Sequence, residues 1–398
     1  MIDLAAALER LMRFLAVEGI TGEERAIAKE IQSALRAAGL ANRAIHFDNA
    51  NERIPLPTQT GNLIVSLPGT RPGPHLLFMT HMDTVPLCAG AKPLRKGNRI
   101  VPEGPTALGG DNRTGCAVLV MLAATLLQDK QPHPPITLLF TVREESGLFG
   151  ARHLEPAMLD RPGVGKPVMC FNVDGKSAAE ITVGAVGADR WEVKITGKAA
   201  HAGVHPERGI SASMVAALGM AEVYAGGWFG KVVKDGQEGT SNVGSIGDPD
   251  GGTAGAATNV VTEEVLVRGE SRSHDPRFVR AITAAYKKAF QNAATRVKDD
   301  RGRPAKVRFN ARLDYLPFRL RDDEAVVQRA TAAVRAVGRE PHLRVTNGGL
   351  DANWLVRHGI PTITFGAGQN DIHTTREWVD LTEFESACRL AVELATAE

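Results

Sequence analysis

The sequence is poor in aromatic residues, has almost no net charge and contains no long apolar run. Phe, Trp and Tyr make up 5% of the 398 residues, which disfavours a surface built for stacking nucleic-acid bases. Lys plus Arg number 47 against 45 for Asp plus Glu, and a formal charge of +2 excludes a general nucleic-acid or anionic-membrane surface. The longest nearly apolar run, residues 116–127, falls well short of the roughly 18 residues of a membrane span. These absences favour a globular protein with neither nucleic acid nor membrane as a partner.

Cysteine is also scarce, and its placement indicates a reducing compartment. Cys88, Cys116, Cys170 and Cys388 form no CxxC pair, and three of them lie in or beside apolar segments. We therefore expect reduced, mostly buried thiols. Residues 1–15 carry acidic and basic side chains among the apolar ones, so they lack the uninterrupted core of a signal peptide. We expect a cytoplasmic protein.

What the sequence does contain is an alternation of short apolar runs with helical stretches. Leucines at helical spacing predict a helix from Leu4 to Leu15, and Thr21 followed by Glu24 predicts a capping box at the start of a second helix. Five apolar runs predict buried strands at 62–67, 75–80, 136–142, 168–173 and 362–365. Helices are expected at 112–128 and 382–396. The fold class is therefore α/β, with a mixed central sheet covered by helices on both faces.

The middle of the chain has a different pattern. Strands are predicted at 190–196, 240–246, 260–271 and 306–314, with helices at 210–224 and 276–295 between them. Two helices on one face of a small antiparallel sheet form an α+β sandwich of ferredoxin type. We therefore expect a catalytic domain in two pieces, residues 1–186 and 315–398, with a lid domain of residues 187–314 inserted between them.

Four of the predicted strands are each followed by an acid or a histidine. These residues are His81 and Asp83 after 75–80, Glu144 and Glu145 after 136–142, Asp174 after 168–173, and His373 a short loop after 362–365. Asp111 joins them from a Gly-Gly-Asp-Asn turn at the start of an apolar helix. Ligands of open α/β sheets bind outside the carboxyl ends of the strands, so we expect these side chains to share one edge of the sheet.

Each of these residues has a structural explanation when taken alone. Asp111 fits a helix N-cap, the Glu144–Glu145 pair fits a solvated strand end, and His373 fits a surface histidine. Together they form a set of nitrogen and oxygen ligands without thiolates. Such a set suits a catalytic zinc, manganese or cobalt site better than a structural zinc site. We therefore interpret these residues together, as the ligands of one metal site.

The spacing within the motifs indicates separate roles. His81 and Asp83 are two residues apart, so in extended chain they point to the same side and Asp83 can fix the tautomer of the imidazole. Glu144 and Glu145 are adjacent and point apart, which suits one metal ligand and one free general base. Three carboxylate ligands and two histidines are enough for two ions that share a bridging Asp.

The motifs around these residues run through nearly the whole chain in a fixed order. They are HMDTVP at 81–86, TALGGDNRTG at 106–115, FTVREESGLFGA at 140–151, VDG at 173–175, GKAAHAGVHPERGISA at 197–212, ATNVV at 257–261, GESRS at 269–273, NGGLD at 347–351 and NDIHTTREWV at 370–379. In these stretches the sequence resembles the M20 family of dinuclear zinc peptidases and amidohydrolases, and within it the peptidase T-like aminopeptidases. Asn112 departs from the second acid common in the family, at a position outside the ligand set.

The resemblance implies a ligand set for two divalent ions, zinc first, with cobalt or manganese as alternatives. The implied ligands are His81, Asp111, Glu145, Asp174 and His373, with Asp111 bridging, His81 and Asp174 on one ion, and Glu145 and His373 on the other. The resemblance further implies Glu144 as the general base on the metal-bridging water and Asp83 as the residue that orients His81. In the lid it implies His201 at the oxyanion, and Asn259 and Arg272 at a substrate carboxylate or the oxyanion.

The implied function is hydrolysis of a peptide or amide bond. The first hypothesis is an aminopeptidase acting on short peptides, tripeptides above all, with a homodimer through the lid as an optional assembly. Other M20 activities, a carboxypeptidase or an N-acyl-amino-acid deacylase, use the same metal chemistry and stay open. An inactive metal-binding scaffold is the hypothesis from a different class, and the presence of a base at Glu144 beside a ligand disfavours it.

Overall fold

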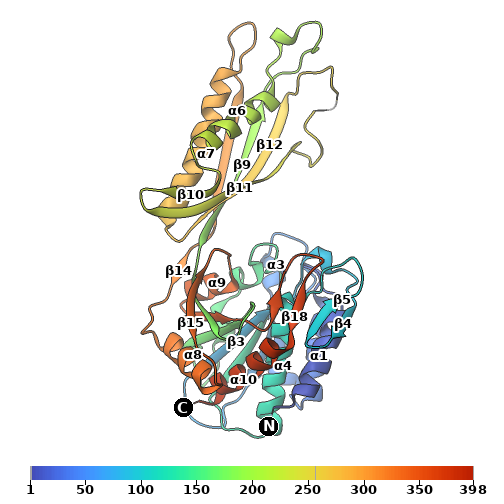
Figure 1. Ribbon diagram of the computed structural model, residues 1–398, viewed down its shortest axis with the longest axis vertical. Helices are drawn as coiled ribbons and strands as arrows, with labels where there is room; N and C mark the ends of the chain where they lie inside the picture. Colours follow the sequence, from blue (N-terminus) through green and yellow to red (C-terminus); the bar gives the residue numbers. More distant parts are fainter. Residues whose placement is uncertain (1, 256, 398) are drawn as a thin grey trace. The chain divides into compact units, whose positions relative to one another are not determined.

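The computed structural model describes residues 2–255 and 257–397, and the chain divides into two compact units. The first unit comprises the described residues of Met1–Gly184, Arg319–Thr346 and Leu350–Glu398. The second comprises Ala185–Phe318 and Asn347–Gly349, again as far as they are described. The chain passes into the second unit after Gly184 and returns at Arg319, where we predicted 186/187 and 314/315, and the short segment Asn347–Gly349 also belongs to the second unit. Figure 1 shows both units, which are described separately below.

The first unit is built on a mixed sheet of nine strands in the described chain. Its order is β1-β2-β6-β3-β7-β16-β8-β14, and β15 also pairs with β8. The strands are β1 (Ile45–Phe47), β2 (Leu63–Leu67), β3 (Leu76–His81), β6 (Ile136–Thr141), β7 (Met169–Val173), β8 (Glu180–Ala185), β14 (Phe318–Arg319), β15 (His342–Thr346) and β16 (Thr362–Phe365). The four central strands β6, β3, β7 and β16 are parallel, whereas β2 and β8 flank them antiparallel. The mixed sheet predicted from the sequence is confirmed.

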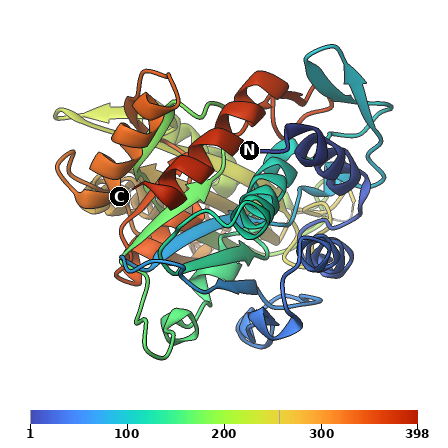
Figure 2. The ribbon, with the colours of Figure 1, turned by 90° about the horizontal axis from the view of Figure 1, so that it is seen from below.

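Helices cover both faces of this sheet. They are α1 (Leu4–Ala16), α2 (Arg25–Ala37), α3 (Ala50–Arg53), α4 (Gly110–Gln128), α5 (Phe149–Arg152), α8 (Ala325–Ala336), α9 (Asp351–Arg357) and α10 (Leu381–Thr396). Helix α4 is apolar on all sides and buried from Gly110 to Leu126, because it packs on β3 while α1, α2 and α10 cover it. Figure 2 shows α4 and α10 on the same side of the sheet. On the opposite face α5 and α9 enclose a core that includes Leu77 and Leu139.

A smaller sheet lies beside the central one within this unit. It joins β17 (Gln369–Asn370), β18 (Trp378–Asp380), β5 (Arg99–Pro102) and β4 (Pro93–Lys96) in that order. The sequence analysis missed these short strands because two to four residues are too few for an alternation pattern. The predicted capping box is wrong: α2 begins at Arg25, and Glu24 makes no side-chain bond to the helix start. Glu24 is instead fully buried.

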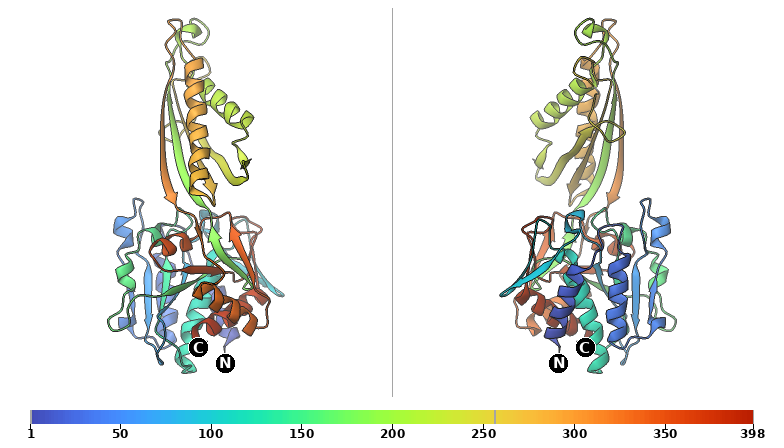
Figure 3. Two further views of the ribbon diagram at one scale, coloured as in Figure 1. Left: turned by 90° about the vertical axis from the view of Figure 1, so that its left-hand side faces the viewer. Right: turned by 90° about the vertical axis from the view of Figure 1, so that its right-hand side faces the viewer.

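The second unit has one antiparallel sheet with helices on a single face. The sheet order is β10 (Gly230–Lys234), β11 (Gln237–Gly247), β12 (Glu264–Ser273), β9 (Gly187–Thr196) and β13 (Lys306–Tyr315). Helices α6 (Ala212–Ala225) and α7 (Pro276–Arg296) pack against it, and Figure 3 shows both on the same side of the strands. The chain order β9-α6-β11-β12-α7-β13 is the βαββαβ arrangement predicted for this segment, with β10 as an added strand.

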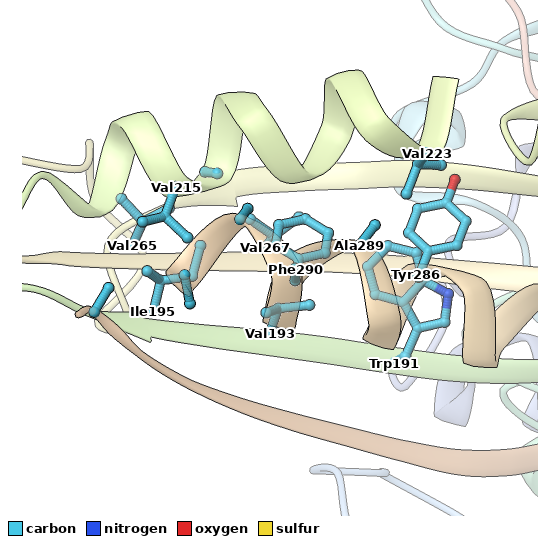
Figure 4. Packing of buried hydrophobic residues seen from close by; sticks show 14 of the residues in the cluster. Trp191, Val193, Ile195, Val215, Val223, Val265, Val267, Tyr286, Ala289 and Phe290 are labelled. Carbon is cyan, nitrogen blue, oxygen red and sulfur yellow. The ribbon is translucent and has the colours of Figure 1, made fainter. Parts of the chain in front are cut away.

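The core of the second unit lies between its helices and its sheet. Alternate residues of β9, namely Trp191, Val193 and Ile195, point toward the helices, and Figure 4 shows them packed with Tyr286 and Phe290. The ring centroids of Trp191 and Tyr286 are 4.4 Å apart. Helix α6 approaches α7 closely because residue 219 is glycine: a Cβ there would lie 2.8 Å from the ring of Phe290. Removing so large a buried side chain as Phe290 typically costs about 3–5 kcal/mol of stability.

A membrane span needs about 20 predominantly apolar residues. Within residues 2–255 and 257–397, no helix is both long and apolar enough to cross a membrane. All four cysteines are free and buried, as the sequence analysis expected.

Candidate metal centre

The candidate site lies at the carboxyl ends of the parallel strands of the first unit. His81 is the last residue of β3, and its strand neighbour in the register is Thr141, the last residue of β6. Asp174 follows β7 and donates its backbone N–H to Phe365 O of β16 at 2.8 Å. Because these strands run in the same direction, the loops that carry His81, Glu144, Glu145 and Asp174 leave the sheet at one edge.

His81 is buried, and both of its ring nitrogens meet acids. Its Nε2 lies 3.1 Å from Asp111 Oδ1, and its Nδ1 lies 3.1 Å from the Asp83 carbonyl oxygen and 3.3 Å from Asp83 Oδ1. Burial by itself lowers the pKa of His81, but the bonds to Asp111 and Asp83 outweigh it and hold the pKa well above its ordinary value. With Nδ1 occupied by Asp83, the Nε2 atom is the one directed at the cluster.

Asp111 places one oxygen against each of the two histidines. Its Oδ1 lies 3.1 Å from His81 Nε2, and its Oδ2 lies 3.2 Å from His373 Nε2. Burial raises the pKa of this carboxyl, but the His373 and His81 imidazoles together hold it well below its usual range. A carboxylate with its two oxygens turned toward different histidines has the arrangement that a bridging ligand requires.

Glu145 and His373 complete the cluster on the other side of Asp111. His373 Nε2 lies 3.0 Å from Glu145 Oε1 and 2.9 Å from Oε2. Hydrogen bonds to Asp111 and then Glu145 raise the pKa of His373 to about 10. Burial and then the charge of Asp111 raise the pKa of Glu145 to about 7. Ligand atoms of His81, Asp111 and Glu145 all lie within 4.8 Å of one another.

Glu144 and Asp174 belong to the same electrostatic group without touching these histidines. Burial raises the pKa of Glu144 well above its ordinary value, with His81 opposing and the charges of Glu145, Asp351 and Asp174 adding to the shift. Burial and then Asp111 raise the pKa of Asp174 in the same way. The Glu144 carboxylate makes no hydrogen bond within the described part of the chain. It therefore differs from Glu145, which is engaged by His373.

The donor set fits divalent metal ions. It consists of imidazole nitrogens and carboxylate oxygens, the ligand types that zinc, cobalt and manganese share, and the acids outnumber the histidines. The carboxylates raise the pKa of both imidazoles, which is the direction expected where negative charge is concentrated. Divalent ions bind such groups in place of their protons, so the affinity of the site for metal is expected to rise as the pH rises.

Asp83 has a contact that the sequence analysis did not foresee. Besides meeting His81, its carboxylate accepts the backbone N–H of Glu144 at 3.1 Å and that of Glu145 at 3.2 Å. Asp83 is fully buried. One side chain therefore holds both the imidazole and the turn that carries the two glutamates.

Glu377 was also missed, although it lies inside the NDIHTTREWV stretch. Its carboxylate accepts the backbone N–H groups of Leu108, Gly109 and Asp111 at 2.8, 2.8 and 3.0 Å, and its exposed fraction is 1%. It thus holds the turn that presents Asp111. The only sequence signal was weak, an acid directly before the apolar pair Trp378 and Val379 in a segment where no strand was predicted.

Asn112 shows why an amide suits its position. Its Nδ2 donates to the Val173 carbonyl at 2.7 Å, and its Oδ1 accepts from the Gly115 amide at 3.1 Å and from Gln369 Nε2 at 2.8 Å. An ionised aspartate could not donate to Val173. Asn112, which stands where the family commonly has a second acid, therefore links the Asp111 turn to the end of β7.

The three remaining predicted residues belong to the second unit. His201 is exposed and bridges to Val260, and the neighbouring Ala202 N–H donates to the Asn259 carbonyl at 2.8 Å. His201 and Asn259 are thus brought together in one corner of this unit. Arg272 lies on β12, where its Nε is 2.9 Å from Glu270 Oε1. That ion pair lies on the sheet face opposite the helices.

A mixed α/β sheet with histidines and carboxylates gathered at the carboxyl ends of its parallel strands defines the protein as a metal-dependent hydrolase. Comparison with known proteins makes the assignment specific. The chain belongs to peptidase family M20/M25/M40, which its residues 77–397 match. The family resemblance and the assignment as a metallopeptidase are confirmed.

Individual relatives agree with this family. Uncharacterized protein YqjE of Bacillus subtilis is 34% identical over 334 residues, which is 84% of either chain. A tripeptidase from Staphylococcus aureus has a crystal structure with a TM-score of 0.86 and 28% identity, covering 100% of this chain and 98% of that one. Aminopeptidase PepT from Bacillus cereus gives a TM-score of 0.81 and 31% identity, covering 99% and 98%.

Proposed function

We propose that this metallopeptidase is an aminopeptidase that removes the first residue of short peptides, tripeptides above all, with two divalent metal ions. The observation that carries the proposal is Asp111, whose two carboxylate oxygens face His81 and His373 separately. The likeness to a tripeptidase and an aminopeptidase over nearly the full length of both chains supports this substrate class.

We propose the ligands by their position around Asp111. His81 and Asp174 would hold one ion and Glu145 and His373 the other, with Asp111 as a ligand shared by both. When bound, the ions polarise the scissile carbonyl and make water acidic enough to be deprotonated near neutral pH. Zinc is our first choice of metal, with cobalt and manganese as alternatives for the same nitrogen and oxygen donors.

Glu144 is the proposed general base. It stands next to a ligand residue, its carboxylate is free of hydrogen bonds in the described chain, and burial raises its pKa well above the ordinary value. A base of raised pKa accepts a proton from attacking water and can then deliver it to the leaving amine. Asp83 keeps His81 in the tautomer that presents Nε2, through the contact at Nδ1.

The second unit supplies the remaining proposed groups and acts as a lid. His201, an exposed imidazole whose Nδ1 accepts the Gly203 N–H at 3.2 Å, stabilises the oxyanion in this proposal. Asn259 and Arg272 receive the substrate carboxylate or the oxyanion. Arg272 is paired with Glu270, its Nε 2.9 Å from Oε1 and its Nη2 3.0 Å from Oε2, so a substrate carboxylate would compete with Glu270 for this guanidinium. Arg272→Lys therefore weakens substrate binding in this proposal, because a lysine cannot form a forked contact.

We also propose that two copies pair through the second unit. Strand β10 pairs with β11 only as far as Ser241, so in the described chain no strand covers the outer edge of residues 242–247. Beside that edge Tyr224, Phe229 and Ile246 are exposed around an apolar hollow. Ile246→Lys is then expected to yield monomers in light scattering, whereas Val233→Lys on β10 leaves the dimer intact; a monomeric parent protein contradicts the proposal.

The substrate class is tested by a turnover screen of the metal-loaded protein. Tripeptides, dipeptides and N-acyl amino acids are incubated with enzyme reconstituted with zinc, cobalt or manganese, and the products are identified by mass spectrometry. Release of the amino-terminal residue of a tripeptide is the expected result. Release of the carboxyl-terminal residue identifies a carboxypeptidase, cleavage of N-acyl amino acids identifies a deacylase, and bound metal without turnover identifies a scaffold.

A further inference from the structure

Glu24 is a buried acid that neither caps its helix nor belongs to the metal cluster. Its exposed fraction is 0%, and its Oε1 accepts two backbone N–H groups, from Gly22 at 2.7 Å and from Arg143 at 3.1 Å. The first of these bonds is local, whereas the second crosses 119 positions of the sequence. The residue that it reaches directly precedes Glu144. The start of α2 is therefore joined to the turn that carries the proposed base.

That turn has a backbone conformation that needs outside support. Arg143 has a φ of +51°, a left-handed conformation that is sterically disfavoured for residues with a side chain. Its guanidinium is held by the same surroundings: Nε donates to Thr58 Oγ1 at 2.7 Å, Nη1 donates to Ser146 Oγ at 3.2 Å, and Nη2 donates to the Pro57 carbonyl. Thr21, three residues before Glu24, donates to the same Ser146 hydroxyl at 2.9 Å.

Two buried carboxylates therefore hold three successive amides. Glu24 accepts from Arg143, and Asp83 accepts from Glu144 and Glu145. Buried N–H groups are costly to leave unpaired, so these bonds restrict the turn to one conformation. A turn fixed in this way sets the direction in which the Glu144 and Glu145 side chains leave the backbone.

We propose that Glu24 is a positioning residue for the general base: its Oε1 atom fixes the Arg143 amide and thereby the direction of the Glu144 carboxylate. The part of the proposal that concerns catalysis rests on the function proposed for Glu144. The part that concerns the turn does not. Gly22 contributes to the same support of the turn, because its φ is +91° and a Cβ there would collide with the Arg143 guanidinium.

The contacts of Glu24 define which side chains can replace it. Only Oε1 is used, and Oε2 is buried without a hydrogen-bond partner in the described part of the chain. A glutamine of the same length keeps the accepting oxygen and removes the charge. An aspartate keeps the charge, but it is one methylene shorter and cannot reach both amides. A positioning role is therefore rescued by Gln and lost with Asp, whereas a purely electrostatic role gives the opposite order.

The experiment compares Glu24→Ala, Glu24→Gln and Glu24→Asp with Glu23→Ala, an exposed neighbour, as the matched control. All are prepared as metal-loaded protein, and hydrogen–deuterium exchange is followed in a peptide that spans 141–148. Loss of a hydrogen bond to a carboxylate is expected to speed exchange of the Arg143 amide by about 10-fold or more in the Ala and Asp variants. The Gln variant and Glu23→Ala are expected to exchange like the parent protein.

The effect on catalysis is measured by steady-state kinetics with trialanine as the substrate. A displaced base lowers kcat by about 10- to 100-fold in the Ala and Asp variants. KM and metal content are expected to stay within about threefold, because Asp83 still holds the Glu145 amide and the other proposed ligands lie on other segments. Gln recovers most of the loss. In a Glu144→Ala background the Glu24→Ala change is expected to have no further effect on the residual rate, since a positioning residue acts only through the group that it positions.

Each outcome decides one part of the proposal. Unchanged exchange in Glu24→Ala overturns the proposed hold on the turn. Faster exchange with an unchanged kcat, in an enzyme that needs Glu144, overturns the catalytic consequence, and so does rescue by Asp in place of Gln. If Glu144→Ala retains the parent rate, the proposed function of Glu144 fails instead, and the exchange measurements still decide whether Glu24 holds the turn. If Glu24→Ala does not fold, the comparison of Gln with Asp gives the answer.

Discussion

At the scale of single residues, Glu144 and Glu145 are chemically identical neighbours that meet different surroundings. Glu145 contacts His373 with both oxygens, at 3.0 and 2.9 Å. The Glu144 carboxylate has no hydrogen-bond partner in the described residues, and burial together with neighbouring acids raises its pKa. Two glutamates in different surroundings can therefore serve one site in two roles, one as a metal ligand and the other as a base.

This difference predicts opposite results for two alanine variants. Glu144→Ala is expected to keep its metal and lose about 10²–10⁴ in kcat, the usual contribution of a general acid–base group. Glu145→Ala is expected to lose affinity for one of the two ions. Metal content measured by mass spectrometry, alongside peptide turnover, distinguishes the two. A Glu144→Ala enzyme with the parent rate refutes the assignment of the base.

His201 allows a matched test within one short loop. His201→Ala is expected to retain both metals and to lose about 10²–10³ in kcat, as when one oxyanion donor is removed. His205 is four residues away, equally exposed and paired with Glu207 at 3.1 Å, so His205→Ala serves as the control with a near-parental rate. Equal losses in the two variants would assign the effect to the loop as a whole.

At the scale of elements, the proposed ligands Asp111 and Glu145 lie on turns that other segments hold in place. Glu377 at the start of β18 accepts three N–H groups of the turn before α4, and Asp83 after β3 accepts two from the turn after β6. Each turn also has local bonds, such as Leu148 N–H to the Glu144 carbonyl at 2.9 Å and Arg113 N–H to the Gly109 carbonyl at 3.2 Å, but the amides of Asp111, Glu144 and Glu145 bond to these distant carboxylates. The position of a ligand is therefore decided by elements that are distant in sequence.

Glu377→Ala tests this support. Three buried amides lose their acceptor, so we expect metal affinity to fall about 10- to 100-fold, as is typical when a partner of a ligand is removed. Thermal stability should fall as well. Arg376→Ala changes the exposed neighbouring residue and controls for the loop. The two effects are measured by competition with a metal chelator and by thermal unfolding. Unchanged metal affinity in Glu377→Ala would contradict the proposed support.

At the scale of the whole molecule, the buried acids predict how stability depends on pH. Burial is the main cause that raises the pKa of Glu24, Glu145 and Asp351 to about 7. In the unfolded chain these groups titrate near 4. Between the two values the folded state retains protons that the unfolded state has released, so the free energy of unfolding falls as pH rises from about 5 to about 7. His373, with its pKa raised to about 10, acts in the same direction above about 6.5.

The measurement uses protein stripped of metal by a chelator. Denaturant unfolding at about pH 5 and about pH 8 is expected to give a lower free energy of unfolding at the higher pH, by an amount on the order of a few kcal/mol. Added zinc binds the deprotonated ligands and should reduce or reverse that difference. A metal-free protein that becomes more stable toward pH 8 would show that the acids are not held protonated in the folded state.

Much of the architecture could be predicted because it depends on local patterns. Apolar runs at 62–67 and 362–365 specify buried strands in any context, and the alternation of strands and helices specifies the α/β class. The two adjacent glutamates and the histidine–aspartate pair gave the candidate ligands in the same way. The start of α2 was predicted wrongly because Thr21 and Glu24 satisfy the local rule for a cap while Glu24 makes its bond to Arg143.

The sequence by itself determined the fold class, the family and the residue types of the candidate metal site, because strand ends in a parallel sheet deliver their side chains to one edge whatever lies around them. Only the tertiary structure decided which acids support the ligands. Glu24, Asp83 and Glu377 reach amides up to 269 positions away in the sequence, and only folding brings them together. A carboxylate becomes a ligand, a base or a support according to what lies within hydrogen-bonding distance, and that distance is set by the packed chain.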